Sequence, residues 1–176
     1  MQKVLLIVMT LFFAVPIVKA QGKDEEEKTV IVKEGNSDSY YYESTVPVDG
    51  ITKEEMFRRA KAWVLSTLKT VDNNVQFDEK EMSIYNSSTV LLKNANEYLN
   101  FKIHILFKDG KYKFRFDNLI VSVPSSVGLF TKPYGPNMFA KGYSKKKMKE
   151  CNEVLYSLST NLENAIKETG AKKEDW

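Results

Sequence analysis

The sequence feature that most constrains the fold is an Asp-Gly pair between two alternating segments. Asp109-Gly110 separates residues 98–108 from residues 111–123, and in both segments apolar side chains recur at nearly every second position. Alternation of this kind is typical of β-strands with one buried face. Because Asp-Gly favours a two-residue type I′ turn, the pair predicts a β-hairpin with a defined register.

This register separates two faces of the hairpin. The apolar face consists of the cross-strand pairs Phe107 with Tyr112, Ile105 with Phe114, and Ile103 with Phe116. The polar face consists of Lys108 with Lys111, Lys102 with Asp117, and His104 with Arg115. Cross-strand neighbours of the second kind belong on a solvated surface, where we expect His104 to lie. Beyond Phe116 the apolar residues change parity, which predicts a β-bulge near Asp117-Asn118.

The segment before the hairpin predicts a strand followed by a helix. Residues 38–48 alternate, with Tyr40, Tyr42, Ser44, Val46 and Val48 on one face. Pro47 places this strand at a sheet edge or ends it there. Thr52 as N-cap and Glu55 three residues later form a capping box, so a helix should start at Lys53. Its predicted buried face is Met56, Phe57, Ala60, Trp63, Val64, Leu68 and Val71.

Two further strands and a second helix complete the expected fold. Alternation recurs over residues 75–78 and 82–92, and a helix capped by Ser144 carries a regular apolar stripe. The stripe is Met148, Cys151, Leu155, Leu158, Leu162, Ala165 and Ile166. The element order β-α-β-β-β-β-α predicts an α+β domain: an antiparallel sheet of about five strands with both helices packed on one face.

The segment between the hairpin and the last helix, residues 124–143, has no usable period. It interleaves turn residues with the aromatic residues Phe130, Tyr134, Phe139 and Tyr143. A loop of this length is uncommon in a compact domain and is often a lid or a binding surface. We therefore expect these aromatic side chains to contact a ligand or partner. The alternative is that they cap the end of the sheet.

A basic cluster, Lys145, Lys146 and Lys147, follows at the start of the second helix. Cations at a helix N-terminus oppose the macrodipole. An anionic partner would relieve that repulsion, so these lysines are a second candidate contact surface. The alternative is a hydrated first turn.

The first twenty residues predict export. Lys3 precedes an apolar run from Val4 to Val18, and Ala20 offers a small residue for a signal peptidase. The alternative is a membrane anchor, but the run of about 15 residues is shorter than the roughly 20 that span a bilayer. We predict cleavage after Ala20, a periplasmic or secreted protein, and no transmembrane anchor after cleavage.

The remaining chain divides into a charged leader, residues 21–37, a single domain, residues 38–170, and a frayed end, residues 171–176. The whole chain has 26 basic and 23 acidic residues. Two of the basic residues, Lys3 and Lys19, leave with the signal, so the exported chain has a net charge of only +1. A chain so nearly neutral has no global field to attract nucleic acid, and we expect none as a partner.

Reactive residues are few. With one cysteine and one histidine, the chain has no internal disulfide, no cysteine-built zinc site and no redox pair. We assign no catalytic residue, cofactor or metal. Cys151 lies on the apolar stripe of the second helix, where an inert buried thiol is expected. The acidic run Asp78-Glu79-Lys80-Glu81 is read as a solvated turn.

Two segments resemble a known family. They are the run Val-Asp-Gly-Ile-Thr-Lys-Glu-Glu-Met-Phe-Arg-Arg-Ala-Lys-Ala-Trp at residues 48–63 and Phe-Lys-Asp-Gly-Lys-Tyr-Lys-Phe at residues 107–114. They are similar to an uncharacterised family of bacterial exported domains with a TATA-binding-protein-like (TBP-like) fold. The resemblance covers roughly residues 40–123 and implies a fold and a Gram-negative envelope context, but no activity.

These observations favour a non-enzymatic binding or interaction domain of the bacterial envelope. Its expected partner is an envelope protein or an anionic or apolar ligand. Two alternatives stand beside it. One is a carrier with an apolar pocket between the sheet and the last helix. The other is an enzyme whose carboxylates are assembled only by the fold.

Overall fold

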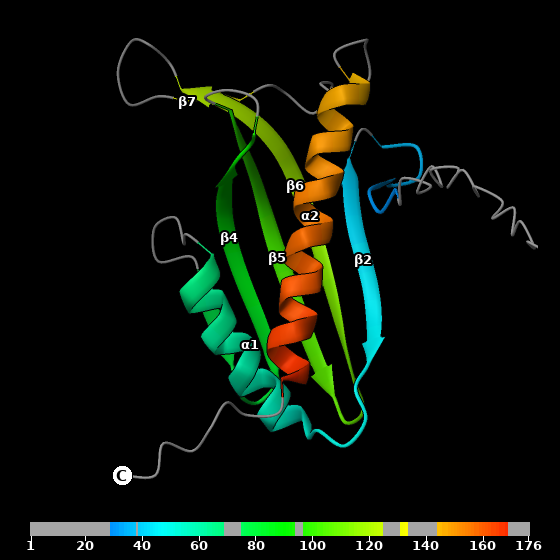
Figure 1. Ribbon diagram of the computed structural model, residues 1–176, viewed down its shortest axis with the longest axis vertical. Helices are drawn as coiled ribbons and strands as arrows, with labels where there is room; N and C mark the ends of the chain where they lie inside the picture. Colours follow the sequence, from blue (N-terminus) through cyan, green and yellow to red (C-terminus); the bar gives the residue numbers. More distant parts are fainter. Residues whose placement is uncertain are drawn as a thin grey trace, which may run out of the picture.

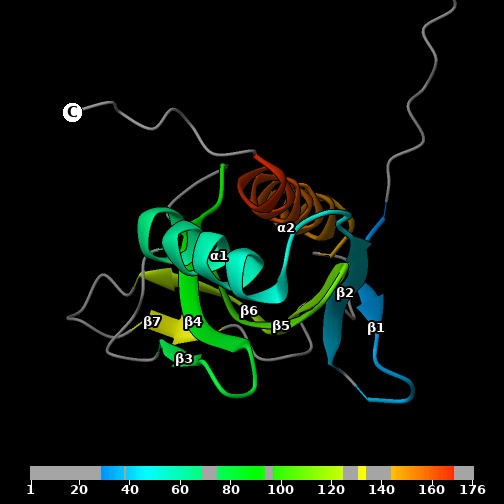
Figure 2. The same cartoon turned by 90° about the horizontal axis from the view of Figure 1, so that it is seen from below.

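A computed structural model of the chain describes residues 29–37, 39–68, 75–93, 97–124, 131–133 and 144–168. The elements are β1 (Val32–Lys33), β2 (Tyr40–Pro47), α1 (Lys53–Thr67), β3 (Gln76–Asp78), β4 (Ser83–Leu91), β5 (Tyr98–Lys108), β6 (Lys111–Pro124), β7 (Thr131–Pro133) and α2 (Ser144–Lys167). The strands form one antiparallel sheet in the order β1-β2-β6-β5-β4-β3, with β7 beside β6 (Figure 1). Both helices lie on the same face of the sheet (Figure 2), so the α+β prediction is confirmed.

The hairpin of β5 and β6 has the predicted register. Ile105 lies opposite Phe114, and His104 lies opposite Arg115. The predicted bulge is also present, because the register shifts between Asn100 and Lys102 while Asn118 adopts a φ of 50°. The bulge lets Phe116 and Leu119 both face the helices.

The turn itself differs from the prediction. Gly110 has a φ of 76°, but Asp109 is not among the residues with positive φ, whereas a type I′ turn needs positive φ at both. Both turn residues accept hydrogen bonds from other parts of the chain. The Asp109 carboxylate accepts a hydrogen bond from the Lys53 backbone N–H at 3.2 Å, and the Gly110 carbonyl accepts one from the Val48 N–H at 2.9 Å. The turn is therefore held against the start of α1.

Replacing Gly110 with valine should destabilise the protein by about 1–2 kcal/mol, because a β-branched residue is forced into the left-handed region. A Cβ at this position would meet no atom within 4 Å, so the cost is conformational rather than steric. Urea denaturation measures it. Gly110→Asn is the matched control, since asparagine tolerates positive φ and should lose much less. Equal losses for the two variants would contradict this explanation.

The core lies between the sheet and the helices. Phe57 of α1 packs edge-on against Phe107 of β5, with ring centroids 5.8 Å apart. The apolar stripe of α2 is buried as predicted, with Cys151, Leu155, Leu162 and Ile166 fully inaccessible. Met148 and Ala165 are partly buried against the same cluster. Val71 lies outside the described residues.

Within the described residues the sheet has seven strands, because two segments predicted to lie outside it pair with it. Part of the predicted charged leader forms β1, with Ile31 buried beside it. The side-chain oxygen of Asn152 on α2 accepts hydrogen bonds from the N–H groups of Val30 at 2.6 Å and Ile31 at 3.2 Å. In the segment predicted to be an irregular loop, residues 131–133 form β7. Neither β1 nor β7 has a periodic pattern long enough to be recognised in the sequence.

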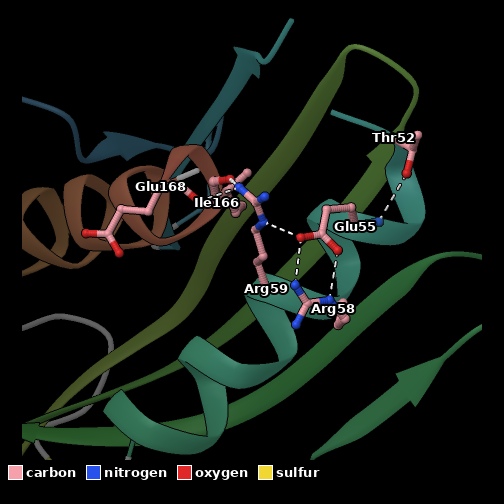
Figure 3. Close-up of polar contacts among 6 residues, drawn as sticks. All are labelled: Thr52, Glu55, Arg58, Arg59, Ile166 and Glu168. Carbon is pink, nitrogen blue, oxygen red and sulfur yellow. Dashed lines mark hydrogen bonds and ion pairs between the residues drawn. The ribbon is translucent and has the colours of Figure 1, made fainter. Parts of the chain in front are cut away.

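The start of α1 is clamped to the end of α2 (Figure 3). Thr52 caps the helix as predicted, accepting from the Glu55 N–H at 3.3 Å. The Glu55 carboxylate accepts from the Arg58 side chain at 2.7 and 2.8 Å and from Arg59 at 2.6 Å, rather than completing the capping box. Arg59 in turn donates to the carbonyls of Ile166 and Glu168 at the end of α2.

Replacing Glu55 with glutamine should destabilise the protein by about 1 kcal/mol at neutral pH, the upper range for partly exposed ion pairs. The hydrogen bonds of Arg58, then those of Arg59, lower the pKa of Glu55 from 4.5 to about 2. Because the folded-state pKa is depressed, this stabilisation is present above pH 4.5 and is lost as the pH falls towards 2. Denaturation across that range checks it. Glu54→Gln is the control, and equal pH profiles for the two variants would contradict the prediction.

Candidate functional site

The face of the sheet opposite the helices carries a row of polar and aromatic side chains. Strand pairing brings Gln76 beside Tyr85, Tyr85 beside His104, and His104 beside Arg115. Because side chains alternate along a strand, the residues two positions away share this face. Ser87, Lys102 and Asp117 therefore form a second row next to the first.

Between the two rows lies an open hollow of about 460 Å³, which we call the His104 hollow. Its side chains are Gln76, Tyr85, Ser87, Lys102, His104 and Asp117. Asn86 and Ile103 also line it, and because they alternate to the helix side, they contribute backbone to its floor. The volume falls within the roughly 300–1,000 Å³ typical of small-molecule sites.

His104 lies on the polar face as predicted, but its side chain is only half-exposed. Its ring stacks on Tyr85, with centroids 3.8 Å apart and planes inclined by 16°. Its Nε2 atom is buried without a hydrogen-bond partner among the described residues. Burial lowers the pKa of His104, while Asp117 opposes this shift and Lys113 adds to it. The imidazole is therefore neutral at pH 7, with one nitrogen that donates and one that accepts.

Arg115 holds most of the charges around the hollow in fixed pairs. Its guanidinium contacts Glu34 at 2.6 Å, Asp117 at 3.3 Å and Glu43 at 3.7 Å, and lies 4.2 Å from the centroid of the Tyr41 ring. The hydrogen bond to Glu34 is the main cause of its raised pKa. Lys102, by contrast, is exposed and has no ion-pair partner in the described part of the chain.

The lysine cluster is split by the fold. Lys145 and Lys146 are exposed, but Lys147 is almost fully buried and pairs with two carboxylates. Its ammonium contacts Glu97, which directly precedes β5, and lies 2.9 Å from Glu150. Burial lowers the pKa of Lys147, but hydrogen bonds with Glu150 and Glu97 outweigh this effect and raise it. Lys147 therefore belongs to the core. Of the three lysines in the cluster, only Lys145 and Lys146 are accessible to an anionic partner.

The other predicted contact residues, Phe130, Tyr134, Phe139 and Tyr143, lie outside the described residues. Cys151 is buried, as predicted, and this burial raises the pKa of its thiol to about 12, which disfavours the reactive thiolate. In the described ranges, no group of three or more His, Cys, Asp or Glu side chains could hold a metal ion. No helix there is long and apolar enough to cross a membrane.

The described geometry gives little support to the two alternative functions, the enzyme and the carrier of an apolar ligand. The fold brings carboxylates together in two places, and in both they are held in ion pairs. Glu97 and Glu150 are buried around Lys147. Glu34, Glu43 and Asp117 contact Arg115, and Asp117 lines the His104 hollow. Between α2 and the sheet, the stripe of α2 packs in one continuous cluster with Phe101, Phe114 and Phe116. The side chains expected to line an apolar pocket there belong to this core cluster.

The sequence predicted the positions of half of the side chains that line the His104 hollow. The hairpin register already placed Lys102, His104 and Asp117 on one face. The sequence did not predict that Tyr85 and Ser87 lie beside them, because the connection between β4 and β5 carries no turn signal that fixes how these two strands pair. The sequence offered one indication of this part of the site, which was the exposed Tyr85 in an alternating strand.

The fold and the sequence agree on one class of protein, an α+β domain of the TBP-like type. Residues 42–121 match the model of a family described as "Domain of unknown function (DUF4468) with TBP-like fold". The chain therefore contains a DUF4468 domain, which confirms the resemblance noted in the sequence.

Two solved structures are similar in fold. A TBP-like protein from Parabacteroides distasonis is 18% identical, with a TM-score of 0.63 over 81% of this chain and 100% of that one. A DUF4468 family protein from Bacteroides ovatus is 11% identical, with a TM-score of 0.58 over 82% of this chain and 93% of that one. No curated protein sequence matches the chain. At these identities the similarity supports the fold alone.

Proposed function

We propose that the chain is an exported, non-enzymatic binding domain of the bacterial envelope, and that it binds its ligand in the His104 hollow. The observation that carries the proposal is the open hollow with its polar lining, to which His104 belongs. The Nε2 atom of His104 is buried and has no hydrogen-bond partner among the described residues. A buried polar atom left without a hydrogen bond costs about 1–3 kcal/mol. A ligand that turns the imidazole so that Nε2 reaches the hollow would remove that cost.

Export is the first part of the proposal to test. The n-region, the short apolar run and Ala20 support cleavage between residues 20 and 21. N-terminal sequencing of the protein from the envelope fraction should begin at Gln21. Recovery of the chain with Met1 still attached, in a membrane pellet, would overturn this part.

Binding is tested through the one histidine of the chain, whose ring gives a single assignable set of NMR signals. We expect these signals to shift when a low-molecular-mass fraction of the envelope of the encoding bacterium is added. Ser87→Tyr should abolish the shift, because a bulky side chain then occupies the hollow. Thr89→Tyr, on the same strand and face but outside the lining, should preserve it. If wild-type signals do not move, or if both variants respond alike, the hollow is not the binding site.

A further inference from the structure

We propose that the ligand of the His104 hollow is an uncharged saccharide, whose hydroxyl groups bond to Gln76, Ser87 and His104 while its ring lies against Tyr85. This inference rests on the proposed function and adds the chemical class of the ligand. It follows from the hydrogen-bonding character and the charge of the side chains that line the hollow.

The lining offers groups that both donate and accept. The amide of Gln76, the hydroxyl of Ser87 and a neutral imidazole at His104 each do so, while Lys102 only donates and Asp117 only accepts. A hydroxyl group is itself both donor and acceptor. A ligand with several hydroxyl groups can therefore satisfy this mixed set.

The charge of the hollow disfavours an anion. Lys102 supplies one cation that has no ion-pair partner among the described residues, but the Asp117 carboxylate lines the same hollow. The nearby Arg115 and Lys113 are already paired, with Glu34 and Asp117 in one case and Glu43 in the other. An anion entering here would gain one ammonium group and would face one carboxylate.

An apolar ligand is disfavoured for a different reason. It would cover Lys102 and Asp117 without supplying a hydrogen bond to either of them. Desolvating polar groups without new partners costs free energy at each group. A ligand that is neutral but rich in hydroxyl groups avoids both penalties.

Tyr85 supplies the apolar contact that a sugar ring needs. Its side chain remains 46% exposed although it stacks on His104. Aromatic side chains combine a large apolar area with little conformational freedom to lose. The C–H groups of a pyranose ring can pack on this surface while the hydroxyl groups reach the polar wall.

The experiment uses the His104 ring signals with defined probes. Glucose, galactose, N-acetylglucosamine and maltose are titrated separately, and acetate, inorganic phosphate and decanoate serve as anionic and apolar comparisons. We expect at least one sugar to shift the signals saturably. Tyr85→Ala should weaken that binding about three- to tenfold. Tyr156→Ala removes a tyrosine that is similarly exposed (42%) but lies on α2, and should leave it unchanged.

The pH dependence gives an independent readout. Tyr85, Lys102, Lys113, Arg115 and Asp117 surround His104 on this face, and burial keeps its imidazole neutral at pH 7. Because a hydroxyl group can accept a hydrogen bond from the protonated ring as well as donate one to the neutral ring, the affinity for a saccharide should change little as the pH falls and His104 takes up a proton. An anionic ligand would instead bind more tightly as the pH falls.

The outcomes separate the two proposals. If the envelope fraction shifts the signals but only acetate, phosphate or decanoate reproduces the effect, the saccharide inference is wrong and the binding function stands. The same conclusion follows if the fraction acts and no probe does. If neither the fraction nor any probe shifts the signals, the binding function itself is wrong. A maltose response much stronger than that of glucose would indicate an oligosaccharide rather than a free monosaccharide.

Discussion

Replacing Phe114 with alanine is expected to destabilise the protein by about 3–5 kcal/mol, the range for removing a fully buried aromatic ring. Phe114 is 1% exposed and lies at the centre of an aromatic cluster. Its ring centroid is 5.1 Å from that of Tyr42, 5.5 Å from that of Phe116 and 6.3 Å from that of Tyr112. The alanine variant loses these contacts and leaves a cavity that rigid strands cannot close. Chemical denaturation measures the loss.

The matched control is His104→Ala, one strand away and on the opposite face of the sheet. It removes the ring contact with Tyr85 but leaves no cavity in the core, so we expect a loss within about 1 kcal/mol. A larger loss for His104→Ala than for Phe114→Ala would mean that the hairpin register is wrong by one residue, because such a slip exchanges the two faces.

Replacing Lys147 with methionine is expected to cost about 3–5 kcal/mol, because it leaves two buried carboxylates without their shared cation. The side chains of Lys147, Glu97 and Glu150 are only 11%, 9% and 5% exposed. Methionine matches lysine in length and flexibility, so packing changes little and the effect reports on charge. Denaturation at neutral pH measures it.

A further result would identify charge as the cause. The triple variant Lys147→Met, Glu97→Gln, Glu150→Gln should recover most of the stability, since it removes both carboxylate charges along with the cation that they share. A single variant as stable as the wild type at neutral pH would show that water screens this cluster.

The sequence by itself determined the hairpin and both helices. Turn chemistry and period-two alternation specify which residues of β5 and β6 face each other, including the bulge at Asn118. These features depend on neighbours close in the chain, where a two-residue turn leaves one register that buries the apolar face. The period of the helices likewise identified Trp63 and Leu155 as core residues. The same local information placed Lys102, His104 and Asp117, half of the side chains that line the His104 hollow, on one face.

Only the tertiary structure decided the rest. The pairing of β4 with β5 stacks Tyr85 on His104. The connection between these strands contains Asn94 and Asn96, which favour a turn but do not fix the register of the strands. The Asp109-Gly110 turn is not of type I′, and the Asp109 carboxylate accepts a hydrogen bond from the start of α1. Lys147 became a buried residue because Glu97, fifty positions earlier, lies beside it. Each of these depends on which distant segment lies opposite, and burial of a polar group is set by that partner rather than by its own stretch of sequence.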